Sequence, residues 1–331
     1  MSLRLRPALG LTLLLGLGAT LYAGCGGGST PTSPVTTTPN PTQNPVAEVP
    51  PPVTLPPVPE TPVQVPVTGS RTTNINVLGD TGWCGSPAMS HIARQLDRLD
   101  GEILLAGDLA YPDGTLAEFR SCFEPDFGRF KSRMRAAPGN HDYVGSASAD
   151  GYFSFFGDRA GPDRRGYYAF KAGEWNVLML NSNVSMARNN QQYMWIQNTL
   201  QTNPTRCSMA VLHHPFDSSG INGPSPWQRD MWEMLYKLGV DVVVAGHDHV
   251  YERHAPMTHE LKRDDTLGIR LFVVGTGGAP LYNKVRTSAN SEKFVQQWGL
   301  LRLKLEPALY EWQFLEYNTG NVLDNGLTIC H

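Results

Sequence analysis

The chain has 331 residues and a formal net charge of −3 at pH 7 with neutral histidines. A mildly acidic chain without a run of basic residues is not typical of nucleic-acid-binding proteins, so we expect no nucleic acid as a partner. Its length allows one large α/β domain together with shorter segments of different composition.

Residues 1–24 predict an export signal. Arg4 and Arg6 precede an apolar run from Leu9 to Leu21, and small residues follow, as in a signal peptide. The run is short for a membrane-spanning helix, and a retained N-terminal anchor is the alternative. The segment that ends at Cys25 resembles a bacterial lipoprotein cleavage site, which implies a lipid anchor on that cysteine. An ordinary signal is the alternative, so the protein is expected to be extracellular, periplasmic or lipid-anchored at the cell envelope.

Residues 25–70 are rich in Pro, Thr, Gly and Val and carry almost no charge. Such a composition cannot bury a hydrophobic core, so this segment is predicted to be a disordered, extended linker. The remaining residues, 71–331, are predicted to form the folded domain.

Apolar runs and turn residues in the folded part predict strands that alternate with helices, followed by antiparallel strands. Ser86 and Pro87 open the first helix as its N-cap and first helical residue. The predicted strands are 74–79, 102–106, 135–138, 166–170, 175–180, 209–212, 241–245, 271–274, 301–305 and 310–317, and the later helices are 191–200 and 225–239. This order predicts mixed sheets covered by helices.

Five predicted strands are followed at once by side chains that can bind metals. In open α/β sheets, sites form at the carboxyl ends of strands. Carboxylates, an amide, imidazoles and a phenol together suit Fe, Mn or Zn. The five motifs are Gly79-Asp80-Thr81-Gly82, Gly107-Asp108-Leu109-Ala110-Tyr111, Gly139-Asn140-His141-Asp142, His213-His214-Pro215 and Gly246-His247-Asp248-His249. Each motif alone is common in turns, but the ordered set predicts a metal site.

The order of these motifs resembles that of the calcineurin-like metallophosphoesterases. Two details are most similar to the purple acid phosphatase branch: Tyr111 stands three residues after Asp108, and the last motif continues as Val250-Tyr251-Glu252-Arg253. The resemblance covers about residues 72–317. It implies an α/β/β/α sandwich of the metallophosphatase type, in which two mixed β-sheets pack face to face and are flanked by helices.

The resemblance also implies a centre of two metal ions, Fe plus Fe, Zn or Mn. One carboxylate would bridge the two ions. The implied ligands are Asp80, Tyr111 and His249 for the first ion, Asp108 for both, and Asn140, His213 and His247 for the second.

Three further residues are candidates for catalysis. His141 resembles the family's histidine that contacts phosphate or assists the leaving group, and Asp142 is expected to orient its imidazole. His214 should point away from the ligands if its strand continues, and a supporting or substrate role stands beside simple packing as an alternative. The larger plant-type enzymes carry more histidines in the following loop, whereas residues 216–226 contain none. His254 is expected at the surface.

Four cysteines remain in the folded part. An even number in an exported chain suggests two disulfides, and a cysteine metal site is the weaker alternative because no CxxC spacing occurs. Three pairings are possible, and the sequence alone does not choose among them. Cys84–Cys122 with Cys207–Cys330 is favoured because the first two cysteines flank the first two motifs.

Together these features predict an exported phosphatase that hydrolyses phosphate monoesters with a metal-bound water or hydroxide. A phosphodiesterase on the same site is the first alternative. A non-catalytic surface binding module is the second, and the intact set of seven ligands argues against it.

Overall fold

The computed structural model describes residues 55–60, 65–67 and 69–331. These residues fall in one compact unit, Thr54–His331. The predicted export signal at residues 1–24 and the predicted lipid site at Cys25 lie outside the described residues. Among the helices of the described part, none is both long and apolar enough to cross a bilayer.

The first sheet has six strands, three of them parallel. The parallel strands carry the first three predicted motifs at their carboxyl ends, and the antiparallel strands extend the sheet to one edge. In spatial order the strands are β13 (Val322–Ile329), β12 (Leu309–Glu316), β11 (Gly299–Glu306), β1 (Thr73–Leu78), β2 (Glu102–Ala106) and β3 (Met134–Ala137).

The second sheet has seven strands and is also mixed. A parallel group of four strands carries the last two predicted motifs, and antiparallel strands lie on both sides of it. In spatial order the strands are β10 (Ser291–Val295), β8 (Tyr251–His254), β9 (Arg270–Val274), β7 (Val242–Ala245), β6 (Ser208–Val211), β5 (Trp175–Met179) and β4 (Tyr168–Ala172).

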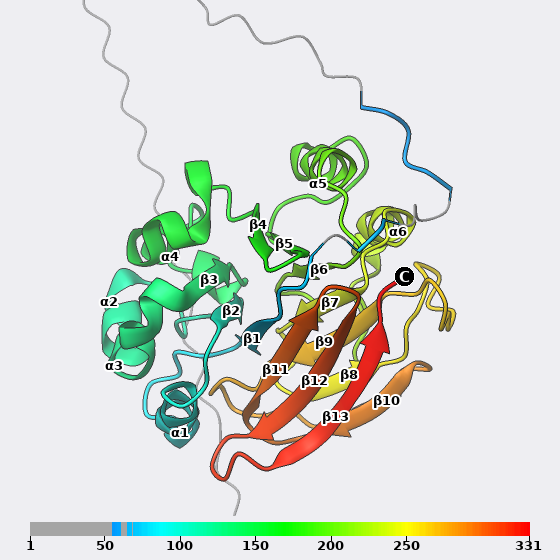
Figure 1. The fold of residues 1–331 in the computed structure, drawn as a ribbon. Coiled ribbons are helices and arrows are strands. Elements are labelled where there is room, and N and C mark those ends of the chain that lie inside the picture. The colour runs from blue at the N-terminus through cyan, green and yellow to red at the C-terminus, as the bar shows by residue number, and fades with distance from the viewer. Residues whose placement is uncertain (1–54, 61–64, 68) are drawn as a thin grey trace, which may run out of the picture. The chain divides into compact units, whose positions relative to one another are not determined.

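Helices cover the outer face of each sheet, and Figure 1 shows α1–α4 on one side and α5 and α6 on the other. The α-helices are α1 (Pro87–Leu96), α2 (Leu116–Glu118), α3 (Glu124–Phe127), α4 (Asp150–Phe156), α5 (Gln191–Thr202) and α6 (Arg229–Lys237). The short 3-10 or π segments are η1 (Phe119–Phe123), η2 (Gly128–Arg133), η3 (His141–Tyr143), η4 (Gly157–Ala160), η5 (Pro162–Arg164) and η6 (Pro226–Gln228).

The strand pleat explains this layering. Successive side chains of a strand point to opposite faces. In β2, Leu104 and Ala106 belong to the core between the two sheets, whereas Ile103 and Leu105 pack against α1 and its neighbours. Both faces of these strands are therefore apolar, as expected for parallel strands buried on both sides. The predicted α/β/β/α sandwich is confirmed.

The predicted elements match the observed ones apart from small shifts at their ends. Strands β8, β10 and β13 were not predicted, nor were the helical segments between residues 116 and 133 and between residues 141 and 164. Those helical segments are three to seven residues long, too short to show a helical period. Strands β10 and β13 lie at the edges of their sheets, where only one neighbour sets the pattern.

Residues inside the predicted linker contact the domain. Val58 packs on the core beside α5 and α6, and Gln197 Nε2 donates to the Pro56 carbonyl at 2.8 Å. Glu60 lies 3.3 Å from Lys237 Nζ. The domain boundary at residue 71 stays a prediction.

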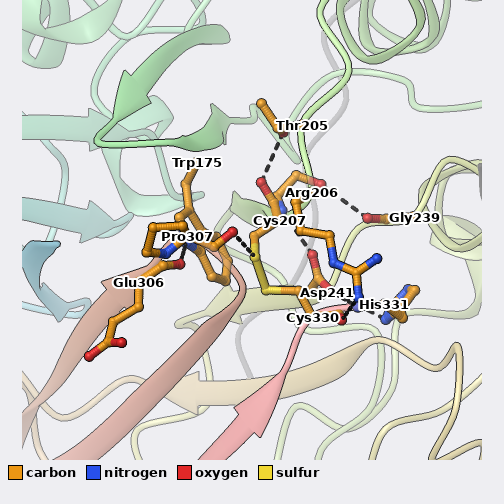
Figure 2. The surroundings of a disulfide bond; sticks show 11 residues. Trp175, Thr205, Arg206, Cys207, Gly239, Asp241, Glu306, Pro307, Cys330 and His331 are labelled. Atoms are coloured by element: carbon orange, nitrogen blue, oxygen red, sulfur yellow. Dashed lines mark hydrogen bonds and ion pairs between the residues drawn. A yellow bond between two sulfur atoms is a disulfide. The ribbon is translucent and has the colours of Figure 1, made fainter. Parts of the chain in front are cut away.

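Two disulfides join distant parts of the chain. Cys84 pairs with Cys122, and Cys207 pairs with Cys330. Figure 2 shows the second bond, which ties the residue before β6 to the residue after β13, with Asp241 beside it. The favoured pairing is confirmed, and the alternative of a cysteine metal site is excluded because all four sulfur atoms are in disulfides.

Candidate metal centre

The seven predicted ligands meet at one place in the structure. Their motifs directly follow the carboxyl ends of β1, β2, β3, β6 and β7, and their donor atoms approach one another closely. The two sheets therefore contribute to one site, as the positions of the motifs predicted.

Three predicted ligands of the first ion surround one hydroxyl group. The Tyr111 hydroxyl lies 3.1 Å from Asp80 Oδ1, 3.1 Å from His249 Nε2 and 3.2 Å from Asp108 Oδ2. A phenol has one proton, so it cannot donate a hydrogen bond to all three of these atoms. Two ligand atoms that each lie 2.0–2.2 Å from a metal ion, at right angles to each other, are about 3 Å apart. The separations around the Tyr111 hydroxyl are therefore those of ligands that share one metal ion. His249 Nδ1 lies 2.8 Å from the Pro280 carbonyl, which leaves Nε2 to face the centre.

The predicted ligands of the second ion surround His213 in the same way. His213 Nε2 lies 3.0 Å from Asn140 Oδ1, 3.2 Å from Asp108 Oδ2 and 3.2 Å from His247 Nδ1. Its Nδ1 lies 2.9 Å from the Ala106 carbonyl, which can accept a proton-bearing Nδ1. When the ring is neutral, Nε2 therefore carries the lone pair, and this lone pair points into the cluster. Asp108 Oδ2 belongs to both donor sets, which is the position a bridging ligand needs.

Backbone groups hold the two carboxylates in place. Asp80 Oδ2 accepts the His247 amide at 2.9 Å, and Asp108 Oδ1 accepts the His141 amide at 2.8 Å. Asp80, Asp108 and His247 have φ angles of 57°, 52° and 69°. This left-handed region is uncommon for residues other than glycine, and such strain clusters at functional sites.

Two glycines allow the strand-end loops to approach. A Cβ on Gly139 would lie 2.1 Å from Asp108 Oδ1, and one on Gly107 would lie 2.5 Å from His213 Nδ1. Gly107 also has a φ of +83°, which favours glycine. These two motif glycines are therefore required by close contacts between loops.

The electrostatics of the cluster favour a positive charge at its centre. Burial alone would lower the pKa of His213, but the neighbouring Asp108 outweighs it and raises that pKa to about 9. Burial and the Asp80 and Asp108 carboxylates raise the pKa of Tyr111 well above its usual value. A bound cation would supply the positive charge that the protonated imidazole otherwise provides, so the donor set fits metal ions.

His141 lies at the edge of the centre beside Tyr111, with ring centroids 4.5 Å apart. Its Nδ1 lies 2.6 Å from the Pro112 carbonyl, so Nε2 is the nitrogen that can meet a substrate. The expectation that Asp142 orients this imidazole is wrong, because the Pro112 carbonyl takes that place.

Asp142 instead joins two strand-end loops. Its carboxylate accepts the backbone N–H groups of Gly139 at 2.8 Å and of Asp108 and Leu109 at 3.1 Å each. The side chain is buried and fixes the loop of Asn140 against the loop of Asp108. Asp142 therefore positions ligands.

His214 lies beside the second donor set. Its ring centroid is 4.4 Å from that of His247, and Ser182 Oγ lies 2.8 Å from its Nδ1. His214 was expected to point away only if its strand continued; β6 ends at Val211, so strand alternation does not apply to it. Ser182 was not predicted as part of the site, although it too follows a buried strand, β5.

His254 does not lie at the surface as expected. It is 0% exposed, and its Nε2 lies 3.8 Å from Glu252 and 3.9 Å from Asp217. Strand β8, which carries it, lies inside the sheet between β10 and β9.

Comparison with known proteins agrees with this arrangement. Residues 73–251 match the family described as calcineurin-like phosphoesterase. Purple acid phosphatase 15 of Arabidopsis thaliana is 28% identical over 243 residues, which cover 62% of this chain and 44% of that protein. The Fe(3+)-Zn(2+) purple acid phosphatase 12 of the same plant is 26% identical over 271 residues, covering 75% of this chain and 55% of that protein.

A solved structure shows the same fold. Purple acid phosphatase PPD1 from yellow lupin (Lupinus luteus) seeds has a TM-score of 0.67 and 20% identity, covering 79% of this chain and 54% of that chain. The chain spans about half the length of these relatives. Since the family match covers more than half of the chain and includes all seven donor residues, this chain belongs to the calcineurin-like phosphoesterase family, and purple acid phosphatases are among its relatives.

Proposed function

We propose that this protein is an exported phosphatase that hydrolyses phosphate monoesters at a centre of two metal ions. The observation that carries the proposal is the pair of donor sets that share Asp108, one around Tyr111 and the other around His213. Membership of the phosphoesterase family supports metal-dependent hydrolysis of phosphoric esters.

The donor set supports iron together with iron, zinc or manganese. Carboxylate, phenolate and amide oxygens combined with imidazole nitrogens suit these ions. One relative carries Fe(3+)-Zn(2+) in its name. In this proposal Asp80, Tyr111 and His249 bind the first ion, Asp108 binds both, and Asn140, His213 and His247 bind the second.

These residues would hold two ions, which when bound would supply an activated water and offset negative charge on the phosphate. His141, fixed through Nδ1 on the Pro112 carbonyl, donates a proton from Nε2 to the leaving-group oxygen. His214, held by Ser182 beside His247, directs its ring toward the phosphate.

Export is supported by the two disulfides, because disulfides persist in oxidising compartments. The predicted signal at residues 1–24 and the lipid on Cys25 belong to the same proposal. Mass spectrometry of the protein purified from membranes and from medium would test both.

The full chain tests the function through its rate on an aryl phosphate monoester and on the matching diester, each with and without a strong chelator. We expect faster, chelator-sensitive cleavage of the monoester. Faster cleavage of the diester would favour a phosphodiesterase. No cleavage of either, with two metals confirmed by elemental analysis, would favour a binding module.

A further inference from the structure

Aromatic side chains stand on the rim of the first donor set. The Trp83 side chain is 40% exposed, and its ring centroid lies 5.2 Å from that of Tyr111. The half-buried Tyr282 stacks on His249, with centroids 4.0 Å apart and planes at 14°. Two of the four proposed ligands of the first ion, Tyr111 and His249, thus each contact an aromatic ring that solvent can reach.

Trp83 also lines a shallow groove of about 300 Å³. Pro87, Pro280 and Trp298 line it as well, and none of its lining residues, all within the described part of the chain, carries a charge. The groove adjoins the metal centre directly, because Pro280 provides the carbonyl that orients His249. Ser86 supplies the one side-chain hydroxyl among these lining residues, so a polar group that loses its hydration water in the groove regains few hydrogen bonds from side chains.

The groove is held rigidly. The Cys84–Cys122 disulfide anchors the loop that carries Trp83, and Trp298 Nε1 donates to the Ala279 carbonyl at 2.7 Å. A Cβ on Gly82 would lie 2.1 Å from the Leu109 carbonyl, so the loop packs directly on the Asp108 loop. A preformed aromatic surface binds an apolar group with a smaller entropic cost.

Trp83 and His141 both contact the ring of Tyr111, with centroid distances of 5.2 Å and 4.5 Å. His141 is the proposed proton donor to the leaving oxygen, so the proposed function places the leaving group near Tyr111, the residue on which Trp83 packs.

We propose that Trp83, with Tyr282 and the groove, binds the leaving group and selects phosphate monoesters of aromatic alcohols over those of polar alcohols such as polyols and sugars. This inference rests on the proposed phosphatase function. Stacking of an aromatic ring on tryptophan strengthens binding by about five- to tenfold relative to a group that cannot stack.

The test measures kcat and KM of the full, metal-loaded chain for 2-naphthyl phosphate and glycerol 1-phosphate. We expect Trp83→Ala to raise KM for the naphthyl ester by about five- to tenfold, with kcat and the glycerol ester nearly unchanged. Trp83→Phe should keep most of the preference. Trp227→Ala is the matched control. Trp227 is similarly exposed, at 49%, but its ring lies beside the second donor set, with its centroid 5.7 Å from that of His214.

Two results would overturn the inference. An equal loss on both esters in Trp83→Ala would show that this residue only supports the Tyr111 loop. Loss of the naphthyl preference in Trp227→Ala alone would place the leaving group on the other side of the centre. Absence of hydrolysis of both esters by the unmodified protein would contradict the proposed function itself, so the two failures are distinguishable.

Discussion

At the scale of single residues, the centre depends on side chains that each make two kinds of contact. Asp108 is the clearest example. One of its oxygens accepts the His141 amide, and the other lies 3.2 Å from both the Tyr111 hydroxyl and His213 Nε2. Replacing this carboxylate with an amide keeps the volume of the side chain but removes its negative charge, which weakens both donor sets.

We therefore expect Asp108→Asn to lower kcat/KM by at least about 100-fold and to lower the bound metal below two ions per chain. Elemental analysis and steady-state kinetics measure the two effects. Asp158→Asn, at an exposed position on η4, is the matched control and should change neither. Full activity of Asp108→Asn would remove the bridging role.

A different result is expected for His141, because its imidazole belongs to neither donor set: its backbone amide donates to Asp108, and its ring packs on Tyr111. We expect His141→Ala to lower kcat by about 100- to 10,000-fold for alkyl phosphates while both metals stay bound. The loss should be smaller for 4-nitrophenyl phosphate, whose leaving group needs less protonation. Loss of the metals in this variant would instead make His141 a ligand.

At the scale of elements, the centre is built from the ends of several strands. The loops that follow these strands can approach one another only because glycines stand at their contacts. Parallel strands from both sheets end at the same place, and the loops after β2 and β3 touch through Gly139 and Asp142. The positions of these elements decide the geometry more than the identity of any one ligand.

Gly139→Ala tests this dependence without changing a ligand. The added methyl group would lie 2.1 Å from Asp108 Oδ1, so the β3 loop must move and the bridging carboxylate with it. We expect a loss of metal affinity of about 10- to 100-fold, measured by competition with a chelator. Gly128→Ala is the control, since its methyl group would meet only the flexible Glu124 side chain. Equal affinities would contradict the close-packing argument.

At the scale of the whole molecule, the Cys207–Cys330 disulfide and its surroundings join β6, β7 and the segment after β13. Asp241 lies at this junction (Figure 2) and accepts the backbone amides of Ser208 and His331. Burial raises the pKa of Asp241 to about 7 and lowers the pKa of His331 to about 4.

These shifts predict a dependence of stability on pH. Between about pH 4 and pH 7 the folded state holds the Asp241 proton that the unfolded state releases, so this group's contribution to the free energy of unfolding falls as pH rises. His331 has the opposite slope, which masks the effect in the unmodified protein.

We expect the free energy of unfolding of Asp241→Asn, relative to the unmodified protein, to increase as pH rises from about 4 to 7. Urea unfolding at several pH values measures this difference, with Asp158→Asn as the control. A difference that is independent of pH would show that the folded-state pKa of Asp241 is not raised.

The sequence by itself determined the order of most strands and of the longer helices, and its motifs, through their resemblance to the family, indicated the proposed donor set. Apolar runs are local features, and a polar motif directly after a buried strand lies at a sheet edge whatever the rest of the chain does. The seven donors from Asp80 to His249 are brought together for this reason. The positions of the cysteines favoured the observed disulfide pairing but left three pairings possible, and the structure decided among them.

Only the tertiary structure decided how the surrounding residues act. Asp142 holds backbone amides instead of His141, His214 lies beside the second donor set, and His254 is buried in a strand that lies between two others in its sheet. The aromatic rim around Trp83 joins segments about 200 residues apart in the chain, up to Tyr282 and Trp298. Each of these roles depends on contacts between distant segments, which residue types and local periodicity do not encode.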